Sequence, residues 1–124
     1  MDQAVILSTA RTPIGKAYRG SFNDTDAPTL ASFSIKASIE KADLDPSEIE
    51  DVILGAAVQQ GSQGYNIGRL SAISSGLPVH VPGMSVDRQC ASGLMAIAIG
   101  AKQIACNEMD VVVAGGVELS LIHI

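Results

Sequence analysis

Apolar and polar residues alternate along this chain in blocks, and the lengths of the blocks predict strands followed by helices. Each of four short apolar runs is bounded by turn-forming or charged residues, which is typical of strands buried in a sheet. The four runs lie at residues 4–8, 49–58, 82–86 and 110–114. Between them, apolar residues at helical spacing predict a helix from Thr29 to about Asp43, capped by Thr29, and a short helix over residues 66–75. Strands that alternate with helices favour an α/β fold, with a mostly parallel sheet and helices on both faces.

The longest uninterrupted apolar stretch follows Cys90. Ser92 can cap the helix predicted there, or lie in its first turn, because its hydroxyl can accept an otherwise unpaired backbone N–H. Residues 94–101 carry no polar side chain on any face, which is typical of a helix buried inside a large core. Cys90 lies near the positive end of this helix's dipole, which favours thiolate over thiol. Cys90 is therefore a candidate nucleophile, with an inert buried cysteine as the competing interpretation.

Composition and charge restrict the class of protein without identifying a function. The chain has 124 residues, 47% of them hydrophobic, which is enough for one modest domain. Its formal net charge of −5 argues against a nucleic acid or a membrane surface as partner, since both favour basic patches. No apolar run reaches the roughly 18 residues of a membrane span, and no basic leader precedes the first run. We therefore expect a cytoplasmic protein.

Most other chemistry-bearing residues favour structural interpretations. If Cys90 and Cys106 lie on one helix they are 16 residues apart, about 24 Å along its axis, which is too far for a disulfide. Neither cysteine pairs nor histidine pairs occur at metal-ligand spacing, so we expect no metal site. We expect Cys106 to be a packing or surface thiol and His80 an exposed loop residue. Gly115 and Gly116 more readily allow tight backbone packing than phosphate binding.

Two groups of polar residues are more ambiguous. Asn66 and Arg69 could have a functional role, either in contact with a partner subunit or in support of a catalytic loop. Equally, Asn66 could be a helix cap and Arg69 a solvated cation, and the sequence does not favour either interpretation. The acidic residues Glu48, Glu50 and Asp51 are expected to form a solvated strand entrance rather than a metal site.

Six motifs, found in one order along the chain, carry a resemblance to a known family. They are A-R-T-P-I-G-K at residues 10–16, L-D-P-x-x-I at 44–49, G-x-N-x-x-R at 64–69, G-L-P at 76–78, V-D-R-x-C-A-S-G at 86–93 and D-V-V-V-A-G-G-x-E at 110–118. One such motif would be weak evidence, whereas several in this order and spacing are specific. From residue 4 to about residue 118, the chain resembles the N-terminal third of a thiolase, an acetyl-CoA C-acyltransferase.

The resemblance implies a fold, a reaction and a nucleophile. Thiolases have an αβαβα fold, of which this chain would be the truncated first half, with the helix of residues 94–101 buried between two sheets. In that family the cysteine at the position of Cys90 takes an acyl group from an acyl-CoA thioester, and its backbone N–H would be one donor to the oxyanion. A second acyl-CoA then condenses with the acyl-enzyme, or free CoA cleaves it in the degradative direction. Acyl-CoA and CoA are thus the expected partners, with no further cofactor, and the parent is expected to be a homo-oligomer, a dimer or a tetramer.

The rest of the family's catalytic machinery is expected outside this chain. An activating histidine, a second cysteine, an Asn/His-bearing loop and the loop domain that grips CoA belong to the family's C-terminal part. His80 and His123 do not match the family's histidine motif, and no residue here is assigned to CoA binding. We therefore predict that the 124-residue chain alone is inactive. Its apolar helix, without the second sheet, would expose an aggregation-prone face.

Three alternatives are weighed against a thiolase. A ketoacyl-synthase-like condensing enzyme shares the fold and a cysteine nucleophile, but residues 10–16 and 86–93 favour a thiolase. A non-catalytic thiolase-like carrier protein would lack the distal histidine and second cysteine. A nucleotide-binding module of Rossmann type is disfavoured, because the first apolar run leads into Ala-Arg-Thr-Pro instead of a glycine-rich turn.

The last six residues differ in character from the rest of the chain. Residues 119–124 read Leu-Ser-Leu-Ile-His-Ile, which resembles the in-frame translation of a transposon-end adapter used in DNA sequencing. Our hypothesis is that residues 1–118 are a partial thiolase N-terminal domain and residues 119–124 a non-native tail.

Overall fold

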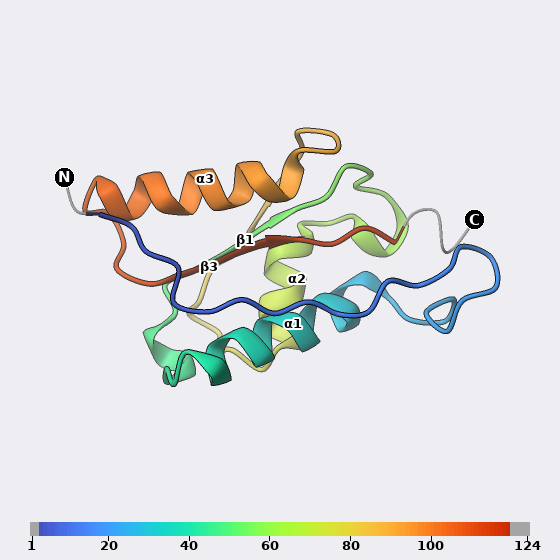
Figure 1. The fold of residues 1–124 in the computed structure, drawn as a ribbon, viewed down its shortest axis with the longest axis horizontal. Coiled ribbons are helices and arrows are strands. Elements are labelled where there is room, and N and C mark those ends of the chain that lie inside the picture. The colour runs from blue at the N-terminus through green and yellow to red at the C-terminus, as the bar shows by residue number, and fades with distance from the viewer. Residues whose placement is uncertain (1–2, 120–124) are drawn as a thin grey trace.

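A parallel sheet lies at the centre of the structure, a computed structural model that describes residues 3–119 (Figure 1). Its strands are β1 (Asp51–Gly55), β2 (Met84–Val86) and β3 (Val112–Gly116), in the order β2-β1-β3. Gly55 is in register with the last residue of β2 and the last residue of β3, so the carboxyl ends of all three strands meet at one edge. In open α/β sheets, ligands bind outside this edge.

Helices cover both faces of the sheet, as the sequence predicts. Helices α1 (Ala27–Lys41) and α2 (Ile67–Ser74) lie on one face, and α3 (Ser92–Ala105) lies on the other (Figure 1). Short 3-10 turns, Pro46–Glu48 and Gly61–Gln63, lie before and after β1. No helix in the described part of the chain is both long and apolar enough to cross a membrane.

Successive side chains of β1 point to opposite faces and so join two different sets of contacts. Val52 and Leu54 belong to the main hydrophobic core, together with apolar residues of α1 and α2. Ile53 points the other way, toward Gly100 of α3. All five residues of β1 are buried, which is expected of a central strand in a parallel sheet.

Helix α1 begins two residues earlier than predicted, and the prediction of Thr29 as its cap is wrong. The cap is Asp26, whose side-chain oxygen accepts a hydrogen bond from the Thr29 backbone N–H at 2.7 Å. Pro28 lies in the first turn, where its missing N–H costs nothing. A carboxylate at the N-cap satisfies one of the free N–H groups of the first turn and also opposes the positive end of the helix dipole.

The predicted strand at residues 4–8 is absent, because this segment pairs with no strand in the described chain. Val5, Ile6 and Leu7 are 67%, 76% and 61% exposed, so the prediction of burial is also wrong. The segment instead runs beside α1 (Figure 1), where Ser8 Oγ donates to the Ser38 carbonyl at 2.6 Å. Apolar composition alone cannot distinguish a paired strand from an extended segment whose partner strand is lacking.

The other predicted elements are confirmed, with shifted ends. The strand predicted at residues 49–58 is β1, the one at 82–86 is β2, and the one at 110–114 is β3. Each observed strand is five residues or shorter, because pairing in this narrow sheet ends where its neighbours end. The short helix predicted at 66–75 is α2, with Asn66 as its N-cap and Ser75 as its C-cap.

Candidate active site

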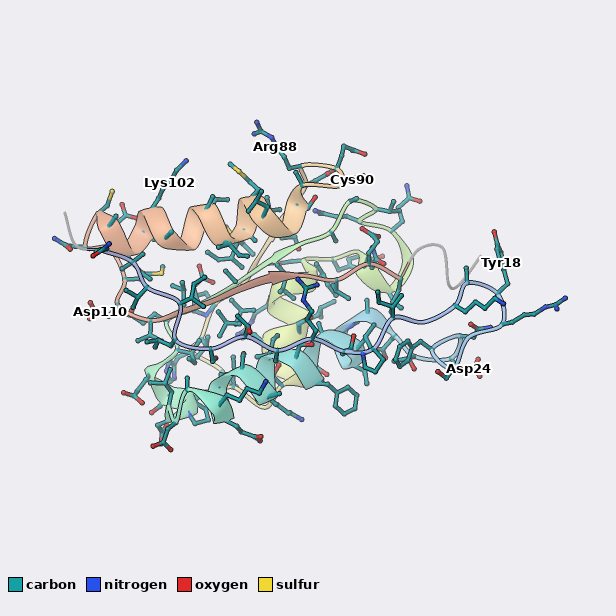
Figure 2. All side chains as sticks on the ribbon, in the orientation of Figure 1. Tyr18, Asp24, Arg88, Cys90, Lys102 and Asp110 are labelled. Atoms are coloured by element: carbon teal, nitrogen blue, oxygen red, sulfur yellow. The ribbon has the colours of Figure 1, made fainter. Side chains whose placement is uncertain are left out.

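Cys90 lies in the connection between β2 and α3, at the carboxyl edge of the sheet. The chain leaves β2 at Val86 and enters α3 at Ser92, with Ala91 as the N-cap. The Cys90 side chain is exposed, and Figure 2 shows it at the N-terminal end of α3, opposite the end that carries Lys102. The sequence-based placement of Cys90 at the start of this helix is confirmed.

The turn before Cys90 is held by side chains. Gln89 has a φ of 51°, a left-handed conformation that is uncommon for a residue other than glycine. Its backbone N–H donates to the Asp87 carboxylate at 2.9 Å. The hydroxyl of Ser92 accepts from the Arg88 backbone N–H at 2.8 Å and donates to the Gln89 carbonyl at 2.6 Å. Ser92 thus lies in the first turn of α3, one of its two predicted roles, although it serves the preceding turn rather than the helix.

Glycines let the start of α3 approach the strand ends closely. A Cβ added to Gly55 would lie 2.2 Å from the carbonyl carbon of Ser92 and 2.3 Å from its oxygen. A Cβ on Gly116 would lie 3.2 Å from the Cα of Gly93. The expected role in tight backbone packing is confirmed for Gly116 and wrong for Gly115, whose added Cβ would meet only the Leu54 side chain, at 3.8 Å. The closest approach to α3 is made by Gly55, which the sequence did not single out.

Helix α3 is buried on one face only. Ser92, Ala96 and Gly100 face the sheet and are buried, whereas Leu94 is 72% exposed and Ile97 is 43% exposed. Burial on all sides, expected of this helix in a complete thiolase fold, is therefore not found in this chain. Only one sheet covers the helix here, so its outer apolar side faces solvent, as expected for a chain without the second sheet.

A polar cluster that sequence reasoning missed lies just beyond β3. The Glu118 carboxylate accepts hydrogen bonds from the Ala57 backbone N–H at 2.8 Å and from the Gln63 side-chain amide at 2.5 Å. Gln63 is 2% exposed, and its amide also donates to the Val58 carbonyl and accepts from the Leu119 N–H. Glu118 ends a motif noted in the sequence, but nothing in that motif identifies Gln63 as its partner. The cluster ties the loop after β1 to the end of β3.

Asn66 and Arg69 both support the segment that leads into β2. Asn66 caps α2 by accepting from the Arg69 N–H at 3.1 Å, and its amide donates to the Gly83 carbonyl at 2.8 Å. The guanidinium of Arg69 donates to the carbonyls of Val79, at 2.9 Å, and Val81. The capping interpretation of Asn66 is confirmed, and that of Arg69 as a solvated cation is wrong.

The acidic strand entrance is solvated only in part. Glu48 and Glu50 are exposed, and hydrogen bonds from the N–H groups of Asp110 and Val111 hold the pKa of Glu50 below its ordinary value. Asp51, by contrast, is only 7% exposed, and desolvation raises the pKa of its carboxyl group. The expectation for Asp51 is therefore wrong, because this residue opens β1, where it pairs with Val112 of β3 and is buried.

The remaining candidates lie away from the turn that carries Cys90. Cys106 is an exposed free thiol at the C-terminal end of α3, and His80 is an exposed loop residue, as predicted. His123 lies outside the described residues. Within residues 3–119, no group of three or more histidine, cysteine or acidic side chains could hold a metal ion.

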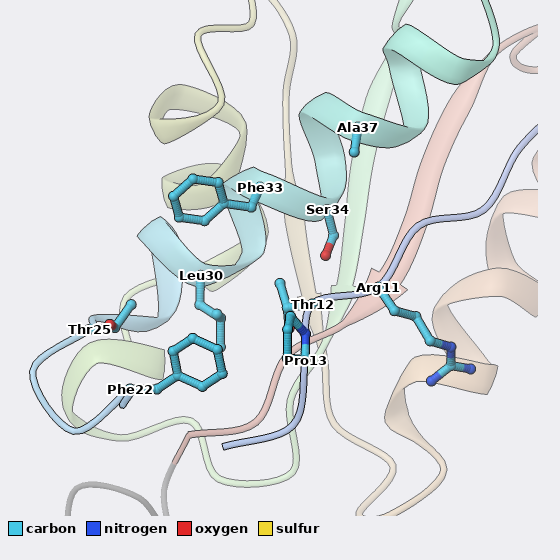
Figure 3. A pocket seen from close by; sticks show the side chains of 9 residues that line it. All are labelled: Arg11, Thr12, Pro13, Phe22, Thr25, Leu30, Phe33, Ser34 and Ala37. Carbon is cyan, nitrogen blue, oxygen red and sulfur yellow. The ribbon is translucent and has the colours of Figure 1, made fainter. Parts of the chain in front are cut away.

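A hollow of about 370 Å³ lies between the N-terminal segment, the loop before α1 and α1 itself (Figure 3). Its walls are mostly apolar and include Pro13, Phe22 and Leu30, while the Arg11 guanidinium points away from it. None of its lining residues belongs to the turn that carries Cys90 or to α3, so we assign it no chemistry.

Comparison with known proteins identifies the family. The sequence model of the thiolase N-terminal domain matches residues 4–121. The chain belongs to this family. It is 42% identical over 118 residues to the acetyl-CoA acetyltransferase of Cupriavidus necator, and 39% identical to the 3-ketoacyl-CoA thiolase of Bacillus subtilis. These alignments cover 95% of this chain but only 30% of either thiolase.

The fold matches that of a solved thiolase over the same part. The crystal structure of the Bacillus anthracis acetyl-CoA acetyltransferase superposes with a TM-score of 0.87 and 34% sequence identity. The superposition covers 94% of this chain and 29% of the thiolase chain. The chain therefore has the fold of the N-terminal part of a thiolase, and it spans about 30% of the length of its relatives.

Proposed function

We propose that the complete protein is a thiolase-type acyl-CoA C-acyltransferase with Cys90 as its nucleophile. The observation that carries this proposal is the placement of Cys90. It is an exposed thiol at the N-terminal end of α3, at the carboxyl edge of a parallel sheet, inside the V-D-R-x-C-A-S-G motif. Relatives that share this part of the chain are acetyl-CoA acetyltransferases and 3-ketoacyl-CoA thiolases.

The proposed chemistry begins with attack of the Cys90 sulfur on the thioester carbonyl of an acyl-CoA. A carbon–sulfur bond forms, and the carbonyl oxygen takes up negative charge, for which the Cys90 backbone N–H is one proposed donor. Collapse of this tetrahedral species breaks the bond to the sulfur of CoA, which leaves with the electron pair as a thiolate. The proton of the Cys90 thiol passes to a base, which we place in the part of the thiolase chain beyond this sequence. A second acyl-CoA then condenses with the acyl-enzyme, or CoA takes up the acyl group in the reverse direction.

The 124-residue chain supplies only part of this machinery. Because it spans about 30% of its relatives, we propose that CoA binding and proton transfer depend on residues outside it. The chain alone should show no thiolysis of 3-ketoacyl-CoA. We propose CoA thioesters as substrates with no further cofactor, and a homo-oligomeric parent.

The test is trapping of the acyl-enzyme in the complete protein, expressed from the recovered reading frame. After brief exposure to acetyl-CoA, peptide mass spectrometry should locate one acetyl group on Cys90. Cys90→Ala should abolish both the adduct and thiolysis of acetoacetyl-CoA. Cys106→Ala is the matched control, because it removes the other exposed thiol of the same helix and should leave both intact. An adduct on another residue, or turnover by Cys90→Ala, would refute the proposal.

A further inference from the structure

The residues that immediately precede Cys90 belong to no helix or strand, and hydrogen bonds of side chains and of the backbone N–H groups of Ala91 and Ser92 hold them in place. Between the end of β2 and the start of α3, the chain reverses through Gln89 in a left-handed conformation. A non-glycine residue keeps such a conformation only where its surroundings impose it. The groups that hold it here are the Asp87 carboxylate, on the Gln89 N–H, and the hydroxyl and backbone N–H of Ser92, both on the Gln89 carbonyl.

Ser92 is the more firmly held of these two groups. Its side chain is 3% exposed, and its hydroxyl is used in both directions, accepting from Arg88 and donating to Gln89. Its backbone lies so close to Gly55 that no side chain fits between them. Ser92 therefore connects a fixed point on the sheet to both residues that precede Cys90. The buried hydroxyl of Ser71 in α2, in contrast, makes no hydrogen bond to the described residues.

We propose that Ser92 is a positioning residue for the acyl transfer to Cys90: its hydroxyl holds the turn of residues 87–89 so that the Cys90 sulfur stays at a fixed place beside the strand ends. The proposal rests on the function proposed above for Cys90. Ser92 does not act on the substrate itself. It fixes the atom that must meet the thioester carbonyl, and transfer of an acyl group held elsewhere in the protein is sensitive to the position of that atom.

This role predicts a different effect on two reactions of the same thiol. Attack on a bound thioester requires the sulfur to lie at one place relative to a carbonyl that the protein holds. Carboxamidomethylation by iodoacetamide has no such requirement, because the reagent is small and approaches an exposed thiol from any direction. Loss of a positioning hydroxyl should therefore slow acylation much more than alkylation, whereas general unfolding would change both.

The experiment measures both reactions at Cys90 in the complete protein. Ser92→Ala should lower the acylation rate at saturating acetyl-CoA by about tenfold or more, with KM and the alkylation rate changed by less than about twofold. Ser92→Thr retains a hydroxyl and should recover most of the rate. Asp87→Ala removes the carboxylate that accepts from the Gln89 N–H, at an exposed position, and should give a smaller loss. Ser71→Ala, which removes a buried hydroxyl on the opposite face of the sheet, should acylate at the wild-type rate.

Three results would overturn the proposal. The first is acylation of Ser92→Ala at the wild-type rate. The second is an equal loss of acylation and alkylation, which indicates a merely structural role. The third is a Ser92→Thr variant as slow as Ser92→Ala, which shows that the hydroxyl is not responsible. If the wild-type protein forms no adduct at Cys90, the proposed function itself fails; an adduct in the wild type with no effect of Ser92→Ala rejects the positioning role alone.

Discussion

Replacing Gly55 with alanine should force the start of α3 away from the sheet. The added Cβ would lie 2.2 Å from the carbonyl carbon of Ser92, whereas ordinary contact begins at 3.4 Å, so α3 would have to withdraw by about 1.2 Å. The atoms in the way are backbone atoms of Ser92 and Gly93, which cannot rotate aside as a side chain can. Overpacking of this kind costs about 1–3 kcal/mol of folding free energy.

Urea unfolding of the chain, followed by far-UV circular dichroism, measures this cost. With a slope of about 1–3 kcal/mol per M, the midpoint of Gly55→Ala should fall by about 1 M. Gly115→Ala is the matched control on the neighbouring strand, because its Cβ would meet only the Leu54 side chain, at 3.8 Å, and its midpoint should barely change. A wild-type midpoint for Gly55→Ala would refute the argument from close approach, and an equal fall in both variants would assign the loss to strand glycines in general.

Three further predictions concern stability and association. Ser71→Ala should raise the free energy of unfolding by about 1 kcal/mol in urea titrations, because it removes a buried hydroxyl that has no hydrogen-bond partner among residues 3–119. Ser75→Ala on the same helix should lower it, because the Ser75 hydroxyl donates to the Ser71 carbonyl. Asp51→Asn should be more stable than the wild type at pH 7. Because the pKa of Asp51 is raised, the native state binds the proton more tightly than the unfolded state, and the wild type loses stability as pH rises above the ordinary value of 3.8. The advantage of the variant should therefore vanish below that pH. Leu94→Lys should reduce self-association in light scattering, because Leu94 is 72% exposed on the apolar side of α3; unchanged scattering would show that this face does not drive association.

Sequence reasoning succeeded where local pattern decides the structure. The apolar runs that became β1, β2 and β3 are flanked by turns, and the run after Cys90 is long enough to require a helix. The position of Cys90, between the end of a strand and the start of a helix, follows from these runs and turns alone. The family resemblance, carried by six spaced motifs, suggested the reaction proposed above, which the hydrophobic pattern could not indicate.

The remaining features depend on contacts between distant residues, which a local pattern does not encode. Residues 4–8 have strand composition, but whether they pair is decided by a neighbour elsewhere. The sequence predicts Asp51 to be a solvated acid, but in the fold this residue pairs with Val112 of β3 and is buried. The sequence left Ser92 as either the cap of α3 or a residue of its first turn, and it did not predict the hydrogen bonds of its hydroxyl to the preceding turn. Gln63 donates a hydrogen bond to Glu118, which lies 55 residues later in the chain, and no motif spacing predicts contacts between residues so far apart.

An accessible thiol lies at each end of α3, so each molecule can form two intermolecular disulfides when it is oxidised. Thiols at opposite ends of one helix are too far apart to form a disulfide with each other, so in air they will form disulfides with neighbouring molecules. Divalent units grow into linear polymers, and a stored sample without reductant should run as a ladder on a non-reducing gel. With Cys106 replaced by alanine, growth should stop at the covalent dimer.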